Sequence, residues 1–275
     1  AVVLMVFVAR YLSRIKDKTV TFRETILPLW LPVFGVLILI LPANFSTAAL
    51  IFAMVLVLVF VGGYPLRYLG LIVGIGLTFL TLFVLTAKAF PGVFPNRVDT
   101  WMSRVENFWQ PTEDKKDDYQ IEKAKIAIAS GGLMGLGPGK SVQKNYLPQS
   151  SSDFIYAIIV EEYGLVGALV LLLLYLFLLF RLVILVYKTQ NFFGRLLVVG
   201  LGLPIIFQAF INMAVAVELF PVTGQTLPLI SAGGSSIWMT CLALGIILSV
   251  SANHNAVMDE TTEEQNPLDM LSETI

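Results

Sequence analysis

The sequence predicts an all-α membrane protein: a polytopic helix bundle with one large loop outside the membrane. Of its 275 residues, 57% are hydrophobic and only 13% are charged. A single soluble core cannot hide that much apolar surface. The apolar residues also come in blocks long enough to cross about 30 Å of hydrocarbon as helices of about 20 residues. These blocks lack strand-like alternation of polar and apolar residues, so a β-barrel is not favoured.

One partial span and six complete spans are expected. Residues 1–9 form an apolar block of only half the length that a span requires, so we expect the chain to be a piece of a longer protein. Short connections make neighbouring spans antiparallel. We therefore treat residues 1–253 as one transmembrane domain that includes a polar loop at 88–153. The complete spans are expected at about 26–42, 45–62, 67–87, 154–187, 195–217 and 227–251.

Basic residues in short loops mark the cytoplasmic side of a membrane protein. Counting spans from the basic segment at 10–23 puts every other short basic loop on the same side. The long loop at 88–153 then faces outward. The acidic tail at 254–275 is cytoplasmic and is expected to be disordered. The basic residues in question are Arg10, Arg14, Lys16, Lys18, Arg23, Arg67, Arg181, Lys188 and Arg195.

Composition gives little support to two kinds of site. The charges are partitioned along the chain and sum to −1, and they do not suggest nucleic-acid binding. Cys241 is the only cysteine, so neither a disulfide nor a cysteine-ligated metal site can form. Its apolar surroundings predict a small buried core residue.

The long loop divides into segments of different character. The charge run at 113–118 is interpreted as a solvated linker, and residues 119–134 have the pattern of an amphipathic helix near the membrane surface. The glycine-rich stretch at 131–141 ends in Gly-Lys-Ser, but Met134 stands where a phosphate-binding P-loop needs a glycine. We expect a tight backbone passage there that uses the conformational freedom of glycine.

Two basic pairs lie in the loop. Arg97 and Arg104 are spaced to share one face of a helix, and Lys140 and Lys144 form the second pair. Such cations suit phosphate groups. Contact with lipid headgroups is an equal alternative, and composition leaves both open.

Three carboxylates stand at the end of the loop. By position, Asp153 suits the N-cap or first turn of the helix that follows. Glu161 and Glu162 lie about 12 to 14 Å further along that helix, where a carboxylate is costly unless it faces a cavity or a partner. A cavity entering from the outer surface would let Asp153 share it with one glutamate.

Five short motifs stand out in the second half of the chain: Ser-Val-Gln-Lys at 141–144, Leu-Pro at 147–148, Asp-Phe-Ile-Tyr-Ala at 153–157, Glu-Glu-Tyr-Gly at 161–164, and the run at 221–236. Together they resemble the SEDS (shape, elongation, division, sporulation) family, and Ser-Val-Gln-Lys favours its division branch. The match covers essentially the whole chain. It implies a fold of ten membrane helices, of which this chain would hold about the fourth to the tenth.

The resemblance implies a peptidoglycan glycosyltransferase that polymerises lipid II at the outer face of the cytoplasmic membrane and releases undecaprenyl pyrophosphate. Asp153 matches the family's essential aspartate and is assigned as the general base. The resemblance assigns no definite cofactor, but a divalent cation, Mg²⁺ or Mn²⁺, could bind the pyrophosphate together with the basic side chains. The candidate substrate contacts are Arg97, Arg104, Lys140, Gln143, Lys144, Glu161, Glu162, Ser231, Gly233, Gly234 and Ser235.

The implied partners are lipid II, the nascent glycan, membrane lipid, a class B penicillin-binding transpeptidase and other divisome membrane proteins at the septum of the inner membrane. No nucleic acid is implied. The chain departs from the family at Gln149 to Ser152, where a glutamate and a histidine are common, at Asn44, and at Ala232. Two other functions stay open: a lipid II transporter and a divisome scaffold without chemistry.

Overall fold

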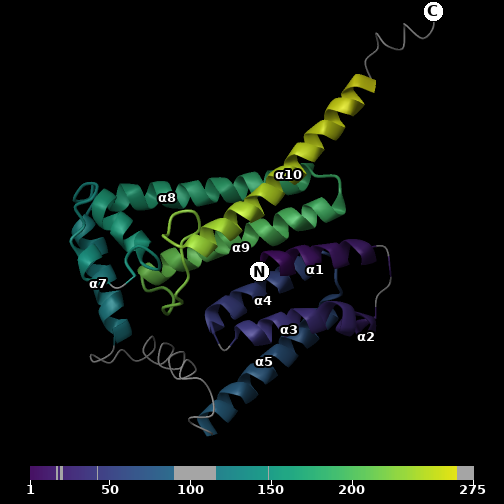
Figure 1. The fold of residues 1–275 in the computed structure, drawn as a ribbon, viewed down its shortest axis with the longest axis horizontal. Helices are drawn as coiled ribbons and strands as arrows, with labels where there is room; N and C mark the ends of the chain where they lie inside the picture. The colour runs from purple at the N-terminus through teal and green to yellow at the C-terminus, as the bar shows by residue number, and fades with distance from the viewer. Residues whose placement is uncertain (17, 19–20, 42, 90–115, 148, 265–275) are drawn as a thin grey trace, which may run out of the picture.

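A computed structural model of the chain describes residues 1–264 except 17, 19–20, 42, 90–115 and 148. Every regular element among them is a helix, which confirms the predicted class (Figure 1). The elements are α1 (Val2–Ile15), α2 (Phe22–Thr25), η1 (Ile26–Trp30), α3 (Leu31–Ile40), α4 (Phe45–Val61), α5 (Leu66–Ala89), α7 (Lys116–Gly131), η2 (Gln143–Asn145), α8 (Ile155–Lys188), α9 (Phe192–Ala216) and α10 (Gly234–Glu264).

Each of the six predicted spans has a helix. Five are long and apolar enough to cross a membrane, and the sixth, Phe45–Val61, has 17 residues and is about 25 Å long. The first span is continuous through α2, η1 and α3, with a π-helical turn at η1 near two prolines that lack the N–H of a regular ladder. The five longer candidates are Phe22–Ile40, Leu66–Thr86, Ile155–Lys188, Phe192–Ala216 and Gly234–Ala252.

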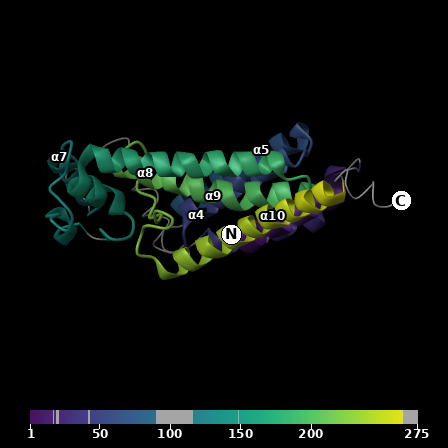
Figure 2. The ribbon, with the colours of Figure 1, turned by 90° about the horizontal axis from the view of Figure 1, so that it is seen from above.

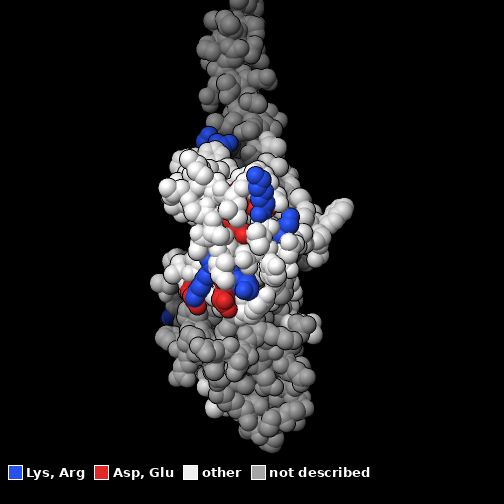
Figure 3. All heavy atoms as spheres, turned by 90° about the vertical axis from the view of Figure 1, so that its left-hand side faces the viewer, with Lys and Arg blue, Asp and Glu red and all other residues white. Residues whose placement is uncertain are grey.

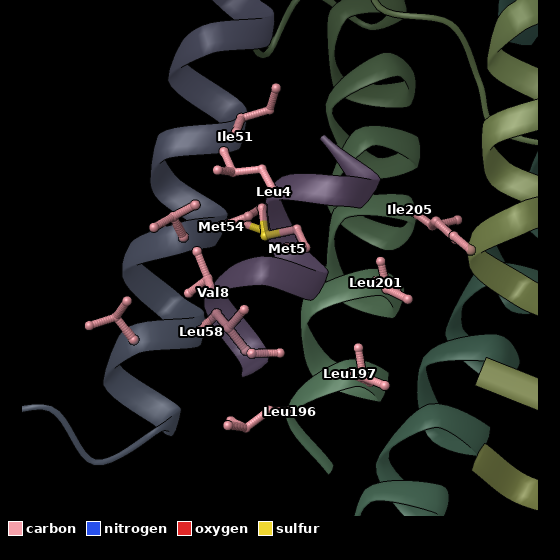
Figure 4. Close-up of a cluster of buried hydrophobic side chains, with 14 of the residues drawn as sticks. Leu4, Met5, Val8, Ile51, Met54, Leu58, Leu196, Leu197, Leu201 and Ile205 are labelled. Carbon is pink, nitrogen blue, oxygen red and sulfur yellow. The ribbon is translucent and has the colours of Figure 1, made fainter. Parts of the chain in front are cut away.

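Helix α9 lies at the centre of the bundle and contacts α1, α4, α8 and α10. Two glycines let its neighbours come close. A Cβ atom at Gly200 would lie 2.9 Å from Leu58 of α4, and one at Gly202 would lie 2.7 Å from Leu182 of α8. Small residues bring helix backbones together in this way in membranes, where van der Waals packing drives association. Figure 4 shows the apolar side chains of α1, α4 and α9 that fill this core, among them Met5, Leu58 and Leu201.

Cations and aromatic rings join the elements at one end of the bundle. The Arg10 guanidinium lies 5.3 Å from the centre of the Phe193 ring, and the Lys16 ammonium lies 5.0 Å from that of Phe192. These contacts tie the end of α1 to the start of α9. Helix α7 and the segment between α9 and α10 lie at the opposite end (Figures 1 and 2). The short basic loops at 10–23 and 188–195 therefore share one side, as the charge pattern predicts.

Two expectations about the last helix are wrong. It begins at Gly234 and not near 227, because the residues before it form turns in which Ile230 and Ser231 donate to the carbonyl of Leu227. Cys241 is exposed on this helix and is not a core residue. The helix also continues to Glu264, into the segment expected to be a tail, while residues 265–275 lie outside the described residues.

Candidate functional site

A second, smaller hydrophobic cluster lies at the loop end of the molecule and joins α7 to the start of α8 and the end of α9. Fully buried alanines of α7 allow the close packing, and an ion pair between Lys125 and Glu218 lies beside it. The predicted helix at 119–134 is thus present as α7, although it begins at Lys116, inside the charge run. The buried members of the cluster are Ala124, Ala127, Leu147, Phe154, Ala157, Ile158, Val215 and Val222.

Helix α8 is broken at Gly164, whose φ of 68° and ψ of −165° are not helical. The glycine-rich stretch supplies the hydrogen bonds that the break removes. The amides of Leu136 and Gly137 donate to the carbonyls of Glu161 and Glu162, each at 2.9 Å. On the other side of the break, the Leu165 amide donates to the carbonyl of residue 132 at 2.9 Å. The loop is therefore part of the helix's own hydrogen-bond ladder.

Three glycines allow this contact, which we call the glycine clasp (residues 131–137 against 160–166). A Cβ atom at Gly131 would lie 2.1 Å from the Val160 carbonyl oxygen, and one at Gly164 would lie 2.3 Å from the Leu133 carbonyl oxygen. At Gly135, which has a φ of +78°, it would lie 2.2 Å from a carbonyl oxygen of α8. Backbone atoms cannot move aside as a flexible side chain does. The expected tight passage is confirmed, and the glycines before the Gly-Lys-Ser sequence serve this contact.

The clasp places the two glutamates against the loop. Glu161 is only 1% exposed, and its carboxylate accepts hydrogen bonds from the Ser141 hydroxyl and from the amides of Val142 at 3.1 Å and Gln143 at 3.3 Å. Glu162 accepts one from the Ser141 amide at 3.4 Å. Glu161 therefore faces the segment 141–143 and not a cavity shared with Asp153, because the loop folds back onto this part of α8 and occupies its carboxylate.

Asp153 lies in the turn before α8, one residue ahead of the N-cap residue Phe154, and is half-buried. Its amide donates to the Gln149 carbonyl at 3.1 Å, and its own carbonyl accepts from the Asn212 side chain at 2.7 Å. Its carboxylate lies beside Gly224, since a Cβ atom at that glycine would lie 3.6 Å from Asp153 Oδ2. Asp153 is therefore outside the first turn of the helix and next to the segment that connects α9 with α10.

That segment, residues 221–233, is fastened to the turn around Asp153. The Ser231 hydroxyl donates to the Ser152 carbonyl at 2.6 Å and accepts from the Leu227 amide at 2.7 Å. The Ala232 amide donates to the Ser151 carbonyl at 2.8 Å. Two motifs that are about 80 residues apart in the chain thus form one site, which we call the aspartate site.

Polar side chains from two more helices complete the aspartate site. Gln208 of α9 donates to the Thr226 carbonyl at 2.9 Å, and Gln225 donates to the Thr47 hydroxyl of α4 at 2.8 Å. The Asn44 side chain accepts from the Thr47 amide at 3.0 Å and caps α4. Sequence reasoning gave no site role to Gln208, Asn212 or Thr47. The signal for the first two was their spacing, because Gln208 and Asn212 are four residues apart and lie on one face of an apolar helix. Buried polar groups in such a helix need hydrogen-bond partners.

The other predicted contacts are dispersed. Lys140 and Lys144 are exposed, as are Gly234 and Ser235 at the start of α10, while Gly233 is half-buried. Arg97 and Arg104 lie outside the described residues. Figure 3 looks onto the loop end and shows basic and acidic side chains close together on a largely uncharged face. In the part of the chain that the structure describes, no three His, Cys, Asp or Glu side chains are grouped so that they could hold a metal ion.

Comparison with known proteins gives consistent matches. The family described as "Cell cycle protein", which groups FtsW, RodA and SpoVE, matches residues 1–256. The chain is 36% identical over 271 residues to the "Probable peptidoglycan glycosyltransferase FtsW" of Hydrogenovibrio crunogenus, covering 96% of this chain and 67% of the relative.

Two solved structures share the fold. A chain of a peptidoglycan synthase complex, solved in work on the coordination of polymerization and crosslinking, is 30% identical with a TM-score of 0.67, and the match covers 92% of this chain and 68% of that one. A mutant of the rod shape determining protein RodA of Thermus thermophilus is 27% identical with a TM-score of 0.58, over 92% and 64% of the two chains. The chain spans about two thirds of the length of these relatives. It belongs to the family of membrane cell cycle proteins that contains FtsW, RodA and SpoVE, the SEDS family.

Proposed function

We propose that the protein of which this chain is part is a peptidoglycan glycosyltransferase that polymerises lipid II at the outer face of the cytoplasmic membrane during septal wall synthesis. The observation that carries the proposal is the position of Asp153. It lies half-buried at the loop end of the bundle, next to Gly224, in a turn whose backbone is hydrogen-bonded by Asn212 and Ser231. The name of the relative from Hydrogenovibrio crunogenus supports the same activity.

Asp153 has the chemistry that chain growth requires. As general base it would take the proton from the 4-hydroxyl of the acceptor GlcNAc, whose oxygen attacks the anomeric carbon of the donor sugar. The bond from that carbon to undecaprenyl pyrophosphate breaks, and negative charge develops on the leaving phosphate. Cations that contact this charge lower the barrier. Lys140, Lys144, Arg97 and Arg104 are the candidates for that contact, and a divalent cation is the alternative.

We assign Glu161 to the folding of the loop that carries these contacts. Its buried carboxylate holds the segment 141–143, which includes Gln143 and immediately precedes Lys144. Glu162, Ser231, Gly233, Gly234 and Ser235 stay candidates for direct contact with lipid II. Among them, Ser231 also fastens the segment beside Asp153.

The proposed partner is a class B penicillin-binding transpeptidase that crosslinks the growing glycan, together with other divisome membrane proteins. The structural relative from a peptidoglycan synthase complex supports such an assembly. The proposed location is the septum of the inner membrane.

The direct test compares Asp153→Asn with wild type in the full-length protein, purified together with its transpeptidase and supplied with lipid II. We expect glycan formation to fall to background while lipid II binding persists, because the amide cannot accept the proton. Glu218→Gln is the control, since it removes a carboxylate at the same end of the molecule. Unchanged glycan formation by Asp153→Asn would rule out its role as the base.

The same variant separates the alternatives. The transporter hypothesis rests on the multi-span bundle and on glutamates at membrane depth, and the contacts of Glu161 with the loop weaken the second of these supports. An Asp153→Asn protein that still flips lipid II in sealed vesicles but does not polymerise it favours the enzyme. Complementation of cell division by a catalytically silent variant would favour a scaffold.

A further inference from the structure

We propose that Asn212 of α9 is a positioning residue that holds Asp153 in register with Gly224; this inference rests on the proposed function. Asn212 is 1% exposed. Its side-chain nitrogen donates to the carbonyl of Asp153 and to the carbonyl of Gln225, each at 2.7 Å. One amide group thus joins the turn that carries the aspartate to the segment that lies against it.

Few side chains can make this bridge. Two carbonyl oxygens repel each other unless a donor with two hydrogens lies between them, and a primary amide supplies both hydrogens from one nitrogen. The contacts also fix the orientation of the amide, because the reverse orientation would put its oxygen against two acceptors. A carboxylate at position 212 would likewise place an oxygen against these two acceptors.

The bridge leaves a buried acceptor unused. Asn212 Oδ1 is one of two buried side-chain oxygen or nitrogen atoms without a hydrogen-bond partner in the described part of the chain. An unpaired polar atom in the interior lowers stability and calls for an explanation. The two donors are needed at this position, because stability alone would favour an apolar side chain at a buried position of α9.

Asn212 controls the aspartate through the backbone. Asp153 lies in a turn and not within a helix, so its position depends on the bonds that its own amide and carbonyl make. The segment 221–233 is also bound to α9 by Gln208, one turn before Asn212, whose side chain donates to the Thr226 carbonyl. Because Asn212 bonds both the Asp153 and the Gln225 carbonyls, α9 sets the distance between the Asp153 carboxylate and the space beside Gly224.

The test measures lipid II polymerisation by the full-length protein with its transpeptidase. Asn212→Leu removes both donors and keeps the branched shape and the number of side-chain heavy atoms, although its methyl groups are larger. We expect kcat to fall about 10- to 100-fold with KM changed less than about threefold, because a base displaced by about 1 Å loses rate more than it loses substrate affinity. Asn212→Ser, which has one short O–H donor, is a second variant of smaller volume and should show the same split.

Thr25→Val is the matched control. Thr25 is fully buried, and its hydroxyl is 2.6 Å from that of Tyr64, near the basic end of the bundle and away from Asp153. Its loss costs a buried hydrogen bond without touching the aspartate site, so kcat should stay within about twofold of wild type. Equal kcat values for Asn212→Leu and Thr25→Val, in proteins of equal thermal stability, would overturn the proposal.

A double-mutant cycle with Asp153→Glu shows whether Asn212 acts through the aspartate. That variant keeps a carboxylate, and we expect it to keep a measurable rate. If Asn212 works by placing residue 153, its substitution should cost much less in the Asp153→Glu protein than in wild type. Fully additive losses would contradict the proposal and leave the proposed function intact. Full activity of Asp153→Asn would instead refute the proposed base.

Discussion

Gly135 lies so close to Glu162 that a Cβ atom at position 135 would be 2.2 Å from the Glu162 carbonyl oxygen. The two residues belong to the glycine clasp, in which the outward loop completes the hydrogen-bond ladder of the broken helix α8. The clasp explains why a sequence that resembles a nucleotide-binding loop stands in a loop expected to face outward. Next to the clasp, the Glu161 carboxylate binds the segment 141–143 to the start of α8.

Gly135→Ala should therefore destabilise the protein strongly. The methyl group clashes with backbone, and the residue is held at a φ of +78°, so we expect a loss of at least about 3 kcal/mol. Thermal unfolding in detergent measures the change. Gly132→Ala separates the two causes, since Gly132 also has a positive φ, of +53°, but has open space around its Cβ position. It should cost only about 1 to 2 kcal/mol, and equal effects would contradict the clash.

Glu161→Gln should loosen the segment 141–143. The amide keeps one acceptor oxygen, but its NH2 group would replace the other and face either the Ser141 hydroxyl or a backbone donor, so we expect a stability loss of about 2 to 4 kcal/mol and faster proteolysis between residues 137 and 146. Limited proteolysis followed by mass spectrometry locates the cuts. Glu162→Gln is the neighbouring control. Its carboxylate accepts a single 3.4 Å bond, and a loss as large as that of Glu161→Gln would argue against the assignment.

Gly224→Ala should lower catalysis more than stability. The new methyl group would lie 3.6 Å from Asp153 Oδ2, in space that we expect the acceptor hydroxyl to enter. We expect kcat for lipid II polymerisation to fall about tenfold or more, while the positive φ of +64° costs about 1 to 2 kcal/mol of stability. Gly63→Ala has a similar φ and open surroundings. A polymerisation rate equal to that of Gly63→Ala would show that this space is not used.

Ser231→Ala and Ser235→Ala should differ. Ser231 is buried and joins the Leu227 amide to the Ser152 carbonyl, so its loss should cost about 1 to 3 kcal/mol and slow polymerisation. Ser235 is exposed at the start of α10, and its loss should leave the melting temperature unchanged. A higher KM for lipid II in Ser235→Ala would support substrate contact there. Equal melting temperatures for both variants would contradict the fastening role of Ser231.

Sequence alone correctly predicted the helical class, the six apolar blocks and the helix at 119–134. These features follow from local hydropathy, because a segment that crosses a bilayer must be apolar over its whole length and satisfy its own backbone hydrogen bonds. The last span was placed seven residues too early, since Leu227 and Ile230 are apolar but lie in turns. Cys241 was misjudged because an apolar residue in a span can face outward as well as inward.

The aspartate site could be located from sequence but not assembled. The position of Asp153 and its motif marked the residue, while its surroundings come from Asn212, Gly224 and Ser231, which are far along the chain. The role of Glu161 was equally hidden. Its depth in the helix suggested a cavity, whereas in the structure the loop folds back onto the helix and bonds its carboxylate. Sequence determined which segments are apolar because hydropathy belongs to each segment alone. Only the tertiary structure decided which polar groups meet, because each buried donor takes the partner that packing brings within reach.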